Sequence, residues 1–238
     1  MKSFYFNQNI KVNIYESFNL LKDEIVNMFI KEFNKGLCIV SGGNTPKKIY
    51  EEISIRNDLR AKIKILLADD RLVPNNNELS NYRMLLNNLK IGYENNYPLS
   101  YYDELERSNL KSLQIKVDMI LKKNKIYSSF LGIGQDGHTA SLFPKTANFT
   151  TDYNSFIIKN DLDNFKRFTL SYKTIMKSKQ IIFIVSGHKK NNILLDFFRG
   201  NHNFDKYPFQ MIASNHKNVE FHCDIEAAKN LNNESNNI

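Results

Sequence analysis

The chain has 238 residues, 42% of them hydrophobic, which is enough for one large α/β domain with a substantial core and excludes disorder throughout. Its formal net charge of +8 would suit an anionic ligand, but the lysines are scattered and the longest basic runs are pairs such as Lys47-Lys48. We expect no nucleic-acid partner, because the sequence contains neither an arginine-rich arm nor zinc-finger spacing.

The two cysteines and the N-terminal residues indicate the cellular compartment that we expect for the protein. Cys38 lies in an apolar run, where a small buried hydrophobe is the default, and Cys38 and Cys223 together do not form a disulfide framework. The first residues contain no apolar segment of the signal-peptide type, and no run approaches the length of a membrane span. We therefore expect a cytoplasmic protein with no membrane partner.

In chain order, apolar runs of strand length alternate with stretches of helical spacing. Phe18 to Phe33 is a predicted core-facing helix, since Leu21, Ile25 and Phe29 recur on one face. The predicted strands are 37–40, 63–68, 127–131, 167–171 and 180–185, and the other predicted helices are 47–53, 81–89, 110–121 and 191–198. Near-continuous apolar runs suit strands buried on both faces, so the pattern predicts an α/β fold with a mainly parallel sheet.

No domain boundary stands out along the chain. We expect residues 1–238 to form a single domain with a polar C-terminal tail from about residue 230 to 238 that frays. The polar, irregular stretch from Asn148 to Asn164 is interpreted as a surface excursion rather than a linker.

Polar loops follow the predicted strands, and ligands of open α/β sheets bind where the carboxyl ends of the strands meet. The first such loop is Ser41-Gly-Gly-Asn-Thr-Pro46, in which Thr45 is a candidate N-cap and Pro46 suits the first turn of a helix. Free amides at a helix start can bind a phosphate or a sugar hydroxyl, although an ordinary strand-to-helix turn fits this loop equally well.

Charged residues follow two other predicted strands and lie on a third. In Asp69-Asp70-Arg71, Asp69 can orient sugar hydroxyls and Arg71 can hold an oxyanion or phosphate, but a surface ion pair fits as well. Arg167 lies on a short predicted strand, and Lys190 follows Gly187 near a helix start, which again suits an anion. For each lysine alone, a solvated charge at a helix end is the more ordinary interpretation.

The most informative stretch runs from Phe130 to Pro144, where an apolar run breaks into three close glycines followed by Asp136 and His138. A histidine can move a proton near neutral pH. The glycine spacing formally matches a dinucleotide fingerprint, but Phe143-Pro144 interrupts the helix that such a fingerprint should open. No His/Cys/Asp cluster with zinc spacing and no Gly-x-Ser-x-Gly elbow of a serine hydrolase is present.

Taken in order, these segments resemble the 6-phosphogluconolactonase family, which is related in fold to glucosamine-6-phosphate deaminases. The matching segments are 41–46, 69–74 with Ser80-Asn81, 132–144, 167–170 and 187–190, while 221–228 resembles the closing helix of the family. The resemblance spans about residues 20 to 230 and implies a doubly wound α/β fold that needs no metal or other cofactor. It implies hydrolysis of 6-phospho-D-glucono-1,5-lactone, a carboxylic ester, to 6-phosphogluconate in the oxidative pentose phosphate pathway. We expect this small molecule to be the partner of a monomer or weak homo-oligomer.

The resemblance also implies roles for individual residues. His138 would be the general base, Asp136 would orient the loop or the imidazole, and Arg71 would stabilise the oxyanion or fix the substrate. The residues that would hold the substrate and its phosphate are Gly42, Gly43, Asn44, Thr45, Asp69, Arg167 and Lys190.

Some positions depart from the family pattern. Asn44 stands where the family usually has Ser, Asp70 where it has Glu, and Phe221 where it often has Trp. The deaminase branch carries a Glu five positions after the histidine, and this chain has Phe143 there, which favours the lactonase over the deaminase. The other alternative is a non-catalytic sugar-phosphate binder on the same scaffold, against which the intact His138 argues.

Overall fold

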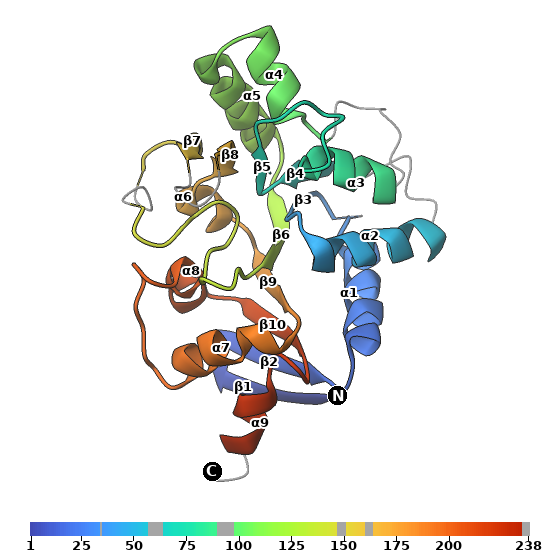
Figure 1. Cartoon of the computed structure of the whole chain (residues 1–238), viewed down its shortest axis with the longest axis vertical. Helices are drawn as coiled ribbons and strands as arrows, with labels where there is room; N and C mark the ends of the chain where they lie inside the picture. The colour runs from blue at the N-terminus through green and yellow to red at the C-terminus, as the bar shows by residue number, and fades with distance from the viewer. Residues whose placement is uncertain (34, 57–63, 90–97, 147–150, 160–163, 235–238) are drawn as a thin grey trace.

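A seven-stranded sheet forms the centre of the computed structural model, which describes residues 1–33, 35–56, 64–89, 98–146, 151–159 and 164–234. The strand order is β1-β2-β10-β9-β6-β3-β4, with β1 antiparallel to β2 and every other neighbouring pair parallel (Figure 1). The strands are β1 (Lys2–Asn7), β2 (Ile10–Tyr15), β3 (Leu37–Val40), β4 (Lys64–Leu67), β6 (Ile126–Gly132), β9 (Gln180–Val185) and β10 (Val219–Asp224).

Helices cover both faces of this sheet. Figure 1 shows α1 and α2 on one side and α7 and α8 on the other, so the predicted mainly parallel, doubly wound α/β fold is confirmed. The main helices are α1 (Phe18–Phe33), α2 (Asn44–Arg56), α3 (Asn81–Leu89), α5 (Leu110–Lys123), α7 (Asn191–Phe198) and α8 (Pro208–Asn215). Shorter helices are α4 (Tyr101–Arg107), α6 (Tyr172–Ile175), the 3-10 turn η2 (His188–Lys190) and α9 (Lys229–Glu234).

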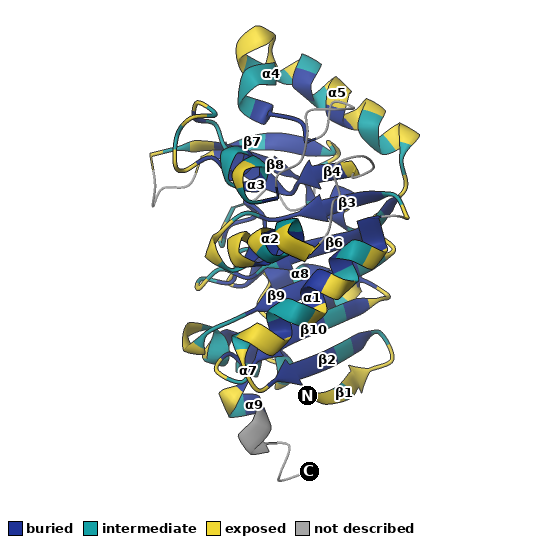
Figure 2. Cartoon of the chain, turned by 90° about the vertical axis from the view of Figure 1, so that its right-hand side faces the viewer, coloured by how far each residue is buried: buried dark blue, intermediate teal, exposed yellow. Residues whose placement is uncertain are grey.

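Aromatic side chains fill the core on each face of the sheet. On one face Phe29 of α1 stacks on Phe130 of β6, with ring centroids 3.7 Å apart. On the other, Phe221 of β10 stacks on Phe183 of β9 at 5.0 Å and meets Phe197 of α7 at 5.6 Å. Figure 2 shows the strands other than β1 as a buried layer between helices with exposed outer faces. This double burial explains why the strands are near-continuous apolar runs.

A second, three-stranded antiparallel sheet has the order β5-β8-β7; its strand β8 confirms the strand predicted at 167–171, but the sheet as a whole was not predicted. It is formed by β5 (Asp69–Arg71), β7 (Ser155–Lys159) and β8 (Lys166–Leu170). The prediction of a loop at 69–71 was therefore wrong, and the irregular excursion at 148–164 contains a strand; residues 147–150 and 160–163 lie outside the described residues. The three residues of β5 are polar and lack strand periodicity, so their pairing with β8 comes from the tertiary fold.

The two ends of the chain also differ from the prediction. The hairpin β1–β2 was not predicted, because β1 is exposed along almost its whole length and its apolar residues do not mark a buried face. Residues 221–224 belong to strand β10 rather than to a closing helix, and α9 begins only at Lys229. Residues 230–234 of the predicted tail are therefore helical, while 235–238 lie outside the described residues. The assignment of residues 1–238 to a single domain stays a prediction.

The strand order sets the position of the crevice. From β3 the chain moves outward to β4, and it then returns to the other side of β3 at β6 before continuing to β9 and β10. The carboxyl ends of the neighbouring strands β3 and β6 therefore form a topological switch point. An open α/β sheet binds its ligand between the loops that leave such a point. The register pairs Val40 with Phe130 and Phe130 with Ile182, so β3, β6 and β9 end at the same edge.

No helix in the described part of the chain is both long and apolar enough to cross a bilayer.

Candidate functional site

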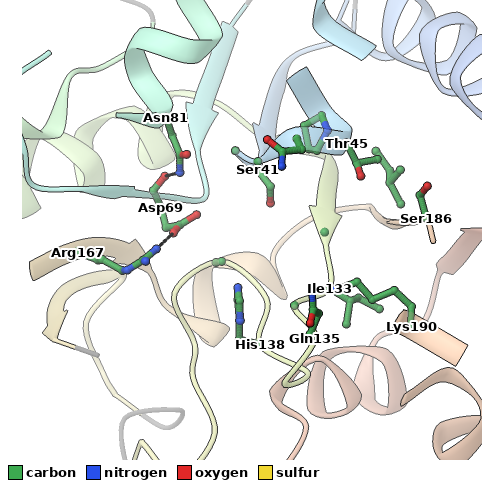
Figure 3. A pocket seen from close by; sticks show the side chains of 18 of the residues that line it. Ser41, Thr45, Asp69, Asn81, Ile133, Gln135, His138, Arg167, Ser186 and Lys190 are labelled. Atoms are coloured by element: carbon green, nitrogen blue, oxygen red, sulfur yellow. Dashed lines mark hydrogen bonds and ion pairs between the residues drawn. The ribbon is translucent and has the colours of Figure 1, made fainter. Parts of the chain in front are cut away.

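A cavity of about 410 Å³ lies at this edge of the sheet. Figure 3 shows side chains from the ends of β3, β6 and β9 and from the small sheet pointing into it. Every residue predicted for the site lines this cavity except Asp136. Asp136 contacts His138, which does line the cavity. The lining residues are Ser41, Gly42, Gly43, Asn44, Thr45, Pro46, Asp69, Arg71, Asn81, Gly132, Ile133, Gly134, Gln135, His138, Ala140, Arg167, Ile184, Ser186 and Lys190.

The loop between β3 and α2 presents the start of a helix to the cavity. The carbonyl of Gly43 accepts the first helical hydrogen bond, from Lys47 N at 3.0 Å, and α2 begins at Asn44. Thr45 thus lies inside the first turn, and its prediction as the N-cap was wrong. Gly43 has φ +107°, a backbone conformation that residues with a side chain rarely adopt. The backbone therefore requires glycine at this position.

His138 and Asp136 form a close pair in the loop after β6. His138 Nδ1 lies 2.6 Å from Asp136 Oδ1, and the same oxygen accepts a hydrogen bond from the His138 backbone N at 3.2 Å. A Cβ on Gly134 would overlap both His138 Nδ1 and Asp136 Oδ1, so the pair needs glycine at that position. With Nδ1–H donating to the carboxylate, Nε2 is the nitrogen that can accept a proton.

The charge on Asp136 depends on this pair. Burial disfavours the ionised carboxyl, but the hydrogen bonds and charge of His138 outweigh that effect and hold the pKa of Asp136 below its usual value. Asp136 is therefore an anion at neutral pH that fixes the tautomer and orientation of the imidazole.

Phe143 packs between two of the polar side chains. Its ring centroid lies 5.0 Å from that of His138, and the guanidinium of Arg167 lies 5.3 Å above the ring. Arg167 is buried and reaches Asp69 Oδ2 at 3.8 Å, and Ser141 Oγ donates to the same carboxylate oxygen. The positive charge of Arg167 is thus shared with Asp69 at the side of the cavity (Figure 3).

Asp70 points away from the cavity and holds the start of α3. It accepts hydrogen bonds from the backbone N of Asn81 at 2.6 Å and of Tyr82 at 2.9 Å. Burial raises its pKa to about 6, against the lowering effect of these two N–H groups. Asp70 itself does not line the cavity, so this departure from the family pattern acts through the position of α3 and of its first residue, Asn81.

Lys190 stands at the other side of the cavity, after the turn that follows β9. Asp224, at the end of β10, accepts hydrogen bonds from Ser186 Oγ and from the backbone N of Gly187 at 3.1 Å, which fixes this turn. Burial lowers the pKa of the Lys190 ammonium, the charge of Asp136 opposes that effect, and Lys189 adds to it. A half-buried ammonium facing a polar cavity is suited to an anion.

Several lining residues were not among the predicted site residues. Asn81 and Ser186 were part of the matching or loop segments but received no role, and Ile133, Ile184 and Ala140 form an apolar part of the wall. Among these residues, Ala140 has an unusual backbone angle, φ +50°. The sequence contains no signal that would have indicated it. Within the described ranges, no three His, Cys, Asp or Glu side chains are grouped so that they could hold a metal ion.

Comparison with known proteins shows what this chain is similar to. The sequence model described as "Glucosamine-6-phosphate isomerases/6-phosphogluconolactonase" matches residues 19–221. A 6-phosphogluconolactonase of Aggregatibacter actinomycetemcomitans is 29% identical over 81% of this chain and 86% of its own. The structure of 6-phosphogluconolactonase from Trypanosoma cruzi superposes with a TM-score of 0.76 at 21% identity, covering 97% of this chain and 99% of that one. A monomeric glucosamine-6-phosphate deaminase superposes with a TM-score of 0.70 at 18% identity, covering 92% and 98%, so the fold alone does not separate the two activities.

The raised pKa of Asp70 predicts a specific pH dependence of stability. Between the usual value near 4 and the folded-state value of about 6, the folded protein holds a proton that the unfolded chain has released. The free energy of unfolding should therefore fall by about 1–3 kcal/mol as the pH rises from 4 to 6, and Asp70→Asn should remove that fall. Urea unfolding at each pH measures this change. The exposed Asp152→Asn is the control, and an unaltered slope in Asp70→Asn would contradict the assignment.

Proposed function

The chain belongs to the glucosamine-6-phosphate isomerase/6-phosphogluconolactonase family, and from that premise we propose that it hydrolyses 6-phospho-D-glucono-1,5-lactone to 6-phospho-D-gluconate in the oxidative pentose phosphate pathway. The observation that carries the proposal is the Asp136–His138 pair, which presents one proton-accepting nitrogen to a cavity that also contains Arg71, Arg167 and Lys190. A lactone is an activated ester, so a base together with charge stabilisation is sufficient chemistry.

The proposed reaction needs one proton acceptor and one stabilised oxyanion. Nε2 of His138 takes a proton from water while the water oxygen bonds to the lactone carbonyl carbon. The negative charge that develops on the carbonyl oxygen is stabilised by Arg71. The bond from this carbon to the ring oxygen then breaks, and His138 returns the proton to that oxygen. Asp136 acts as a positioning residue because it holds Nδ1 and stabilises the imidazolium that forms in between.

The phosphate is assigned to the cationic and amide-rich part of the lining. Arg167 and Lys190 supply positive charge, and the backbone amides of Gly42 and Gly43 stand before the first turn of α2. Arg167 lies 3.8 Å from the carboxylate of Asp69, which offsets part of its positive charge. Lys190 is therefore the cation with more charge available to bind a phosphate. Asn44, Thr45 and Asp69 would contact the sugar hydroxyls. We assign these roles to a single domain that acts as a monomer or weak homo-oligomer on a small molecule.

Phe143 is the observation that favours the lactonase over the deaminase. The position five residues after the histidine, where a deaminase carries Glu, here holds an aromatic ring packed against His138 and Arg167. The site thus lacks the acid that the deaminase uses at this position. A non-catalytic phosphosugar binder would have no use for a proton-accepting nitrogen held in a fixed tautomer.

The function is tested by mixing the purified protein with freshly prepared 6-phosphogluconolactone at neutral pH and titrating the acid that is released. We expect release well above the spontaneous rate and no ammonia from glucosamine 6-phosphate. Hydrolysis at the spontaneous rate would refute the proposed function, and ammonia release would support the deaminase instead.

The assignment of Lys190 to the phosphate predicts an effect on binding more than on chemistry. Lys190→Ala should raise KM about 10-fold to 100-fold and change kcat much less, because one charge-assisted hydrogen bond is lost in substrate and transition state alike. Lys189→Ala is the matched control, since this neighbouring lysine is exposed and does not line the cavity. A loss confined to kcat, with KM unchanged, would show that Lys190 acts on the reacting centre instead.

A further inference from the structure

Asn81, the first residue of α3, forms a hydrogen bond with each of the three residues of β5. Its backbone N donates to Asp70 Oδ1, its side-chain Nδ2 donates to the carbonyl of Asp69 at 3.0 Å, and its Oδ1 accepts from Arg71 Nη1 at 3.0 Å. The side chain is buried and lines the cavity beside Asp69 (Figure 3).

These contacts allow only one orientation of the amide. The carbonyl of Asp69 can only accept a hydrogen bond, and the guanidinium of Arg71 can only donate one. The Nδ2 group must therefore face Asp69 and Oδ1 must face Arg71, because the opposite orientation would place two acceptors together and two donors together. Arg71 Nη1 also donates to the carbonyl of Leu79 at 3.5 Å, which is a longer and weaker contact.

The amide also explains why the neighbouring loop has glycine at position 42. A Cβ on Gly42 would overlap Oδ1, Cγ and Nδ2 of Asn81. The backbone of Gly42, unlike that of Gly43, is not in the positive-φ region, so the conformation itself would accept an alanine. Gly42 is therefore required by the space that Asn81 occupies, whereas Gly43 is required by its own dihedral angle.

We propose that Asn81 is the residue that positions Arg71 for the reaction, and that Gly42 is glycine in order to leave room for it. This inference rests on the proposed function, in which Arg71 stabilises the oxyanion. The backbone amide of Gly42 keeps its proposed place in the phosphate site, and the absence of a side chain at this position is explained by the Asn81 amide. Asn81 itself needs no contact with the reacting atoms, because it acts through the guanidinium.

The two residues should behave as one unit in a double-mutant cycle. Asn81→Ala leaves Arg71 Nη1 without its nearer acceptor and should lower kcat about 10-fold to 100-fold with little change in KM. Gly42→Ala should lower kcat to a similar extent, because it displaces the Asn81 amide. In the Asn81→Ala background the added methyl group has room, so the double variant should match Asn81→Ala within about twofold.

A second background and a control separate packing from hydrogen bonding. Asn81→Asp keeps the volume of the side chain but places a carboxylate oxygen against the carbonyl of Asp69, so Gly42→Ala should still be harmful there. The exposed Asn87→Ala on the same helix is the matched control and should leave kcat unchanged. An equal loss from Gly42→Ala in the wild-type and Asn81→Ala backgrounds would overturn the inference, as would an unchanged kcat in Asn81→Ala.

Thermal unfolding of the same variants is independent of activity. Gly42→Ala should lower the melting temperature by about 5 °C in the wild type and by much less in the Asn81→Ala background. If the wild type fails to hydrolyse the lactone, the proposed function fails, while the melting temperatures still decide whether Asn81 and Gly42 share this space. Equal shifts in both backgrounds would refute the packing relation.

Discussion

The common register of β3, β6 and β9 is the constraint on which the site depends. Parallel pairing places Val40, Phe130 and Ile182 side by side, so the three strands end at one edge. The chain reverses its direction of travel across the sheet between β3 and β6, which opens a crevice between their loops. A slip of two residues in one pairing would keep the faces of the strands but would separate His138 from the cations across the cavity.

Close packing of backbone against polar side chains then fixes the geometry within the crevice. Gly134 lies against the Asp136–His138 pair, and Gly42 lies against the Asn81 amide. In both places the glycine is needed because a side chain already fills the position of a Cβ. The polar groups are thus held by contacts on several sides, and this rigidity suits a site whose chemistry needs only one mobile proton and one fixed positive charge.

The parts of the structure that could be predicted from sequence are those with a local cause. The buried strands and the helix from Phe18 to Phe33 follow from apolar periodicity, and the charged loops follow from the rule that ligands bind at strand ends. The strand β5 could not be predicted in this way, since its polar residues pair only because β8 lies beside them. The closing helix expected at 221–228 was wrong for a similar reason, because Val219–Asp224 forms a strand between β2 and β9.

The candidate site was predicted less completely than the fold. Ionisable residues, such as His138 and Arg71, are conspicuous in sequence, and the resemblance to a family supplied a role for each. The place of Asn81 was not predictable, since its importance depends on two hydrogen bonds and an approach to Gly42 that join segments far apart in the chain. Asp70 shows the reverse case, because a charged residue in a matching segment serves to hold α3.

In the proposed reaction, His138 moves the proton while other residues hold the substrate. The most direct measurement compares kcat for 6-phosphogluconolactone and the affinity for the product 6-phosphogluconate in the wild type and in His138→Ala. We expect a fall in kcat of about 100-fold or more, the usual contribution of a general base, with product affinity nearly unchanged. Undiminished turnover in His138→Ala would show that His138 is not the base, and an equal loss of product affinity would show that His138 binds rather than catalyses.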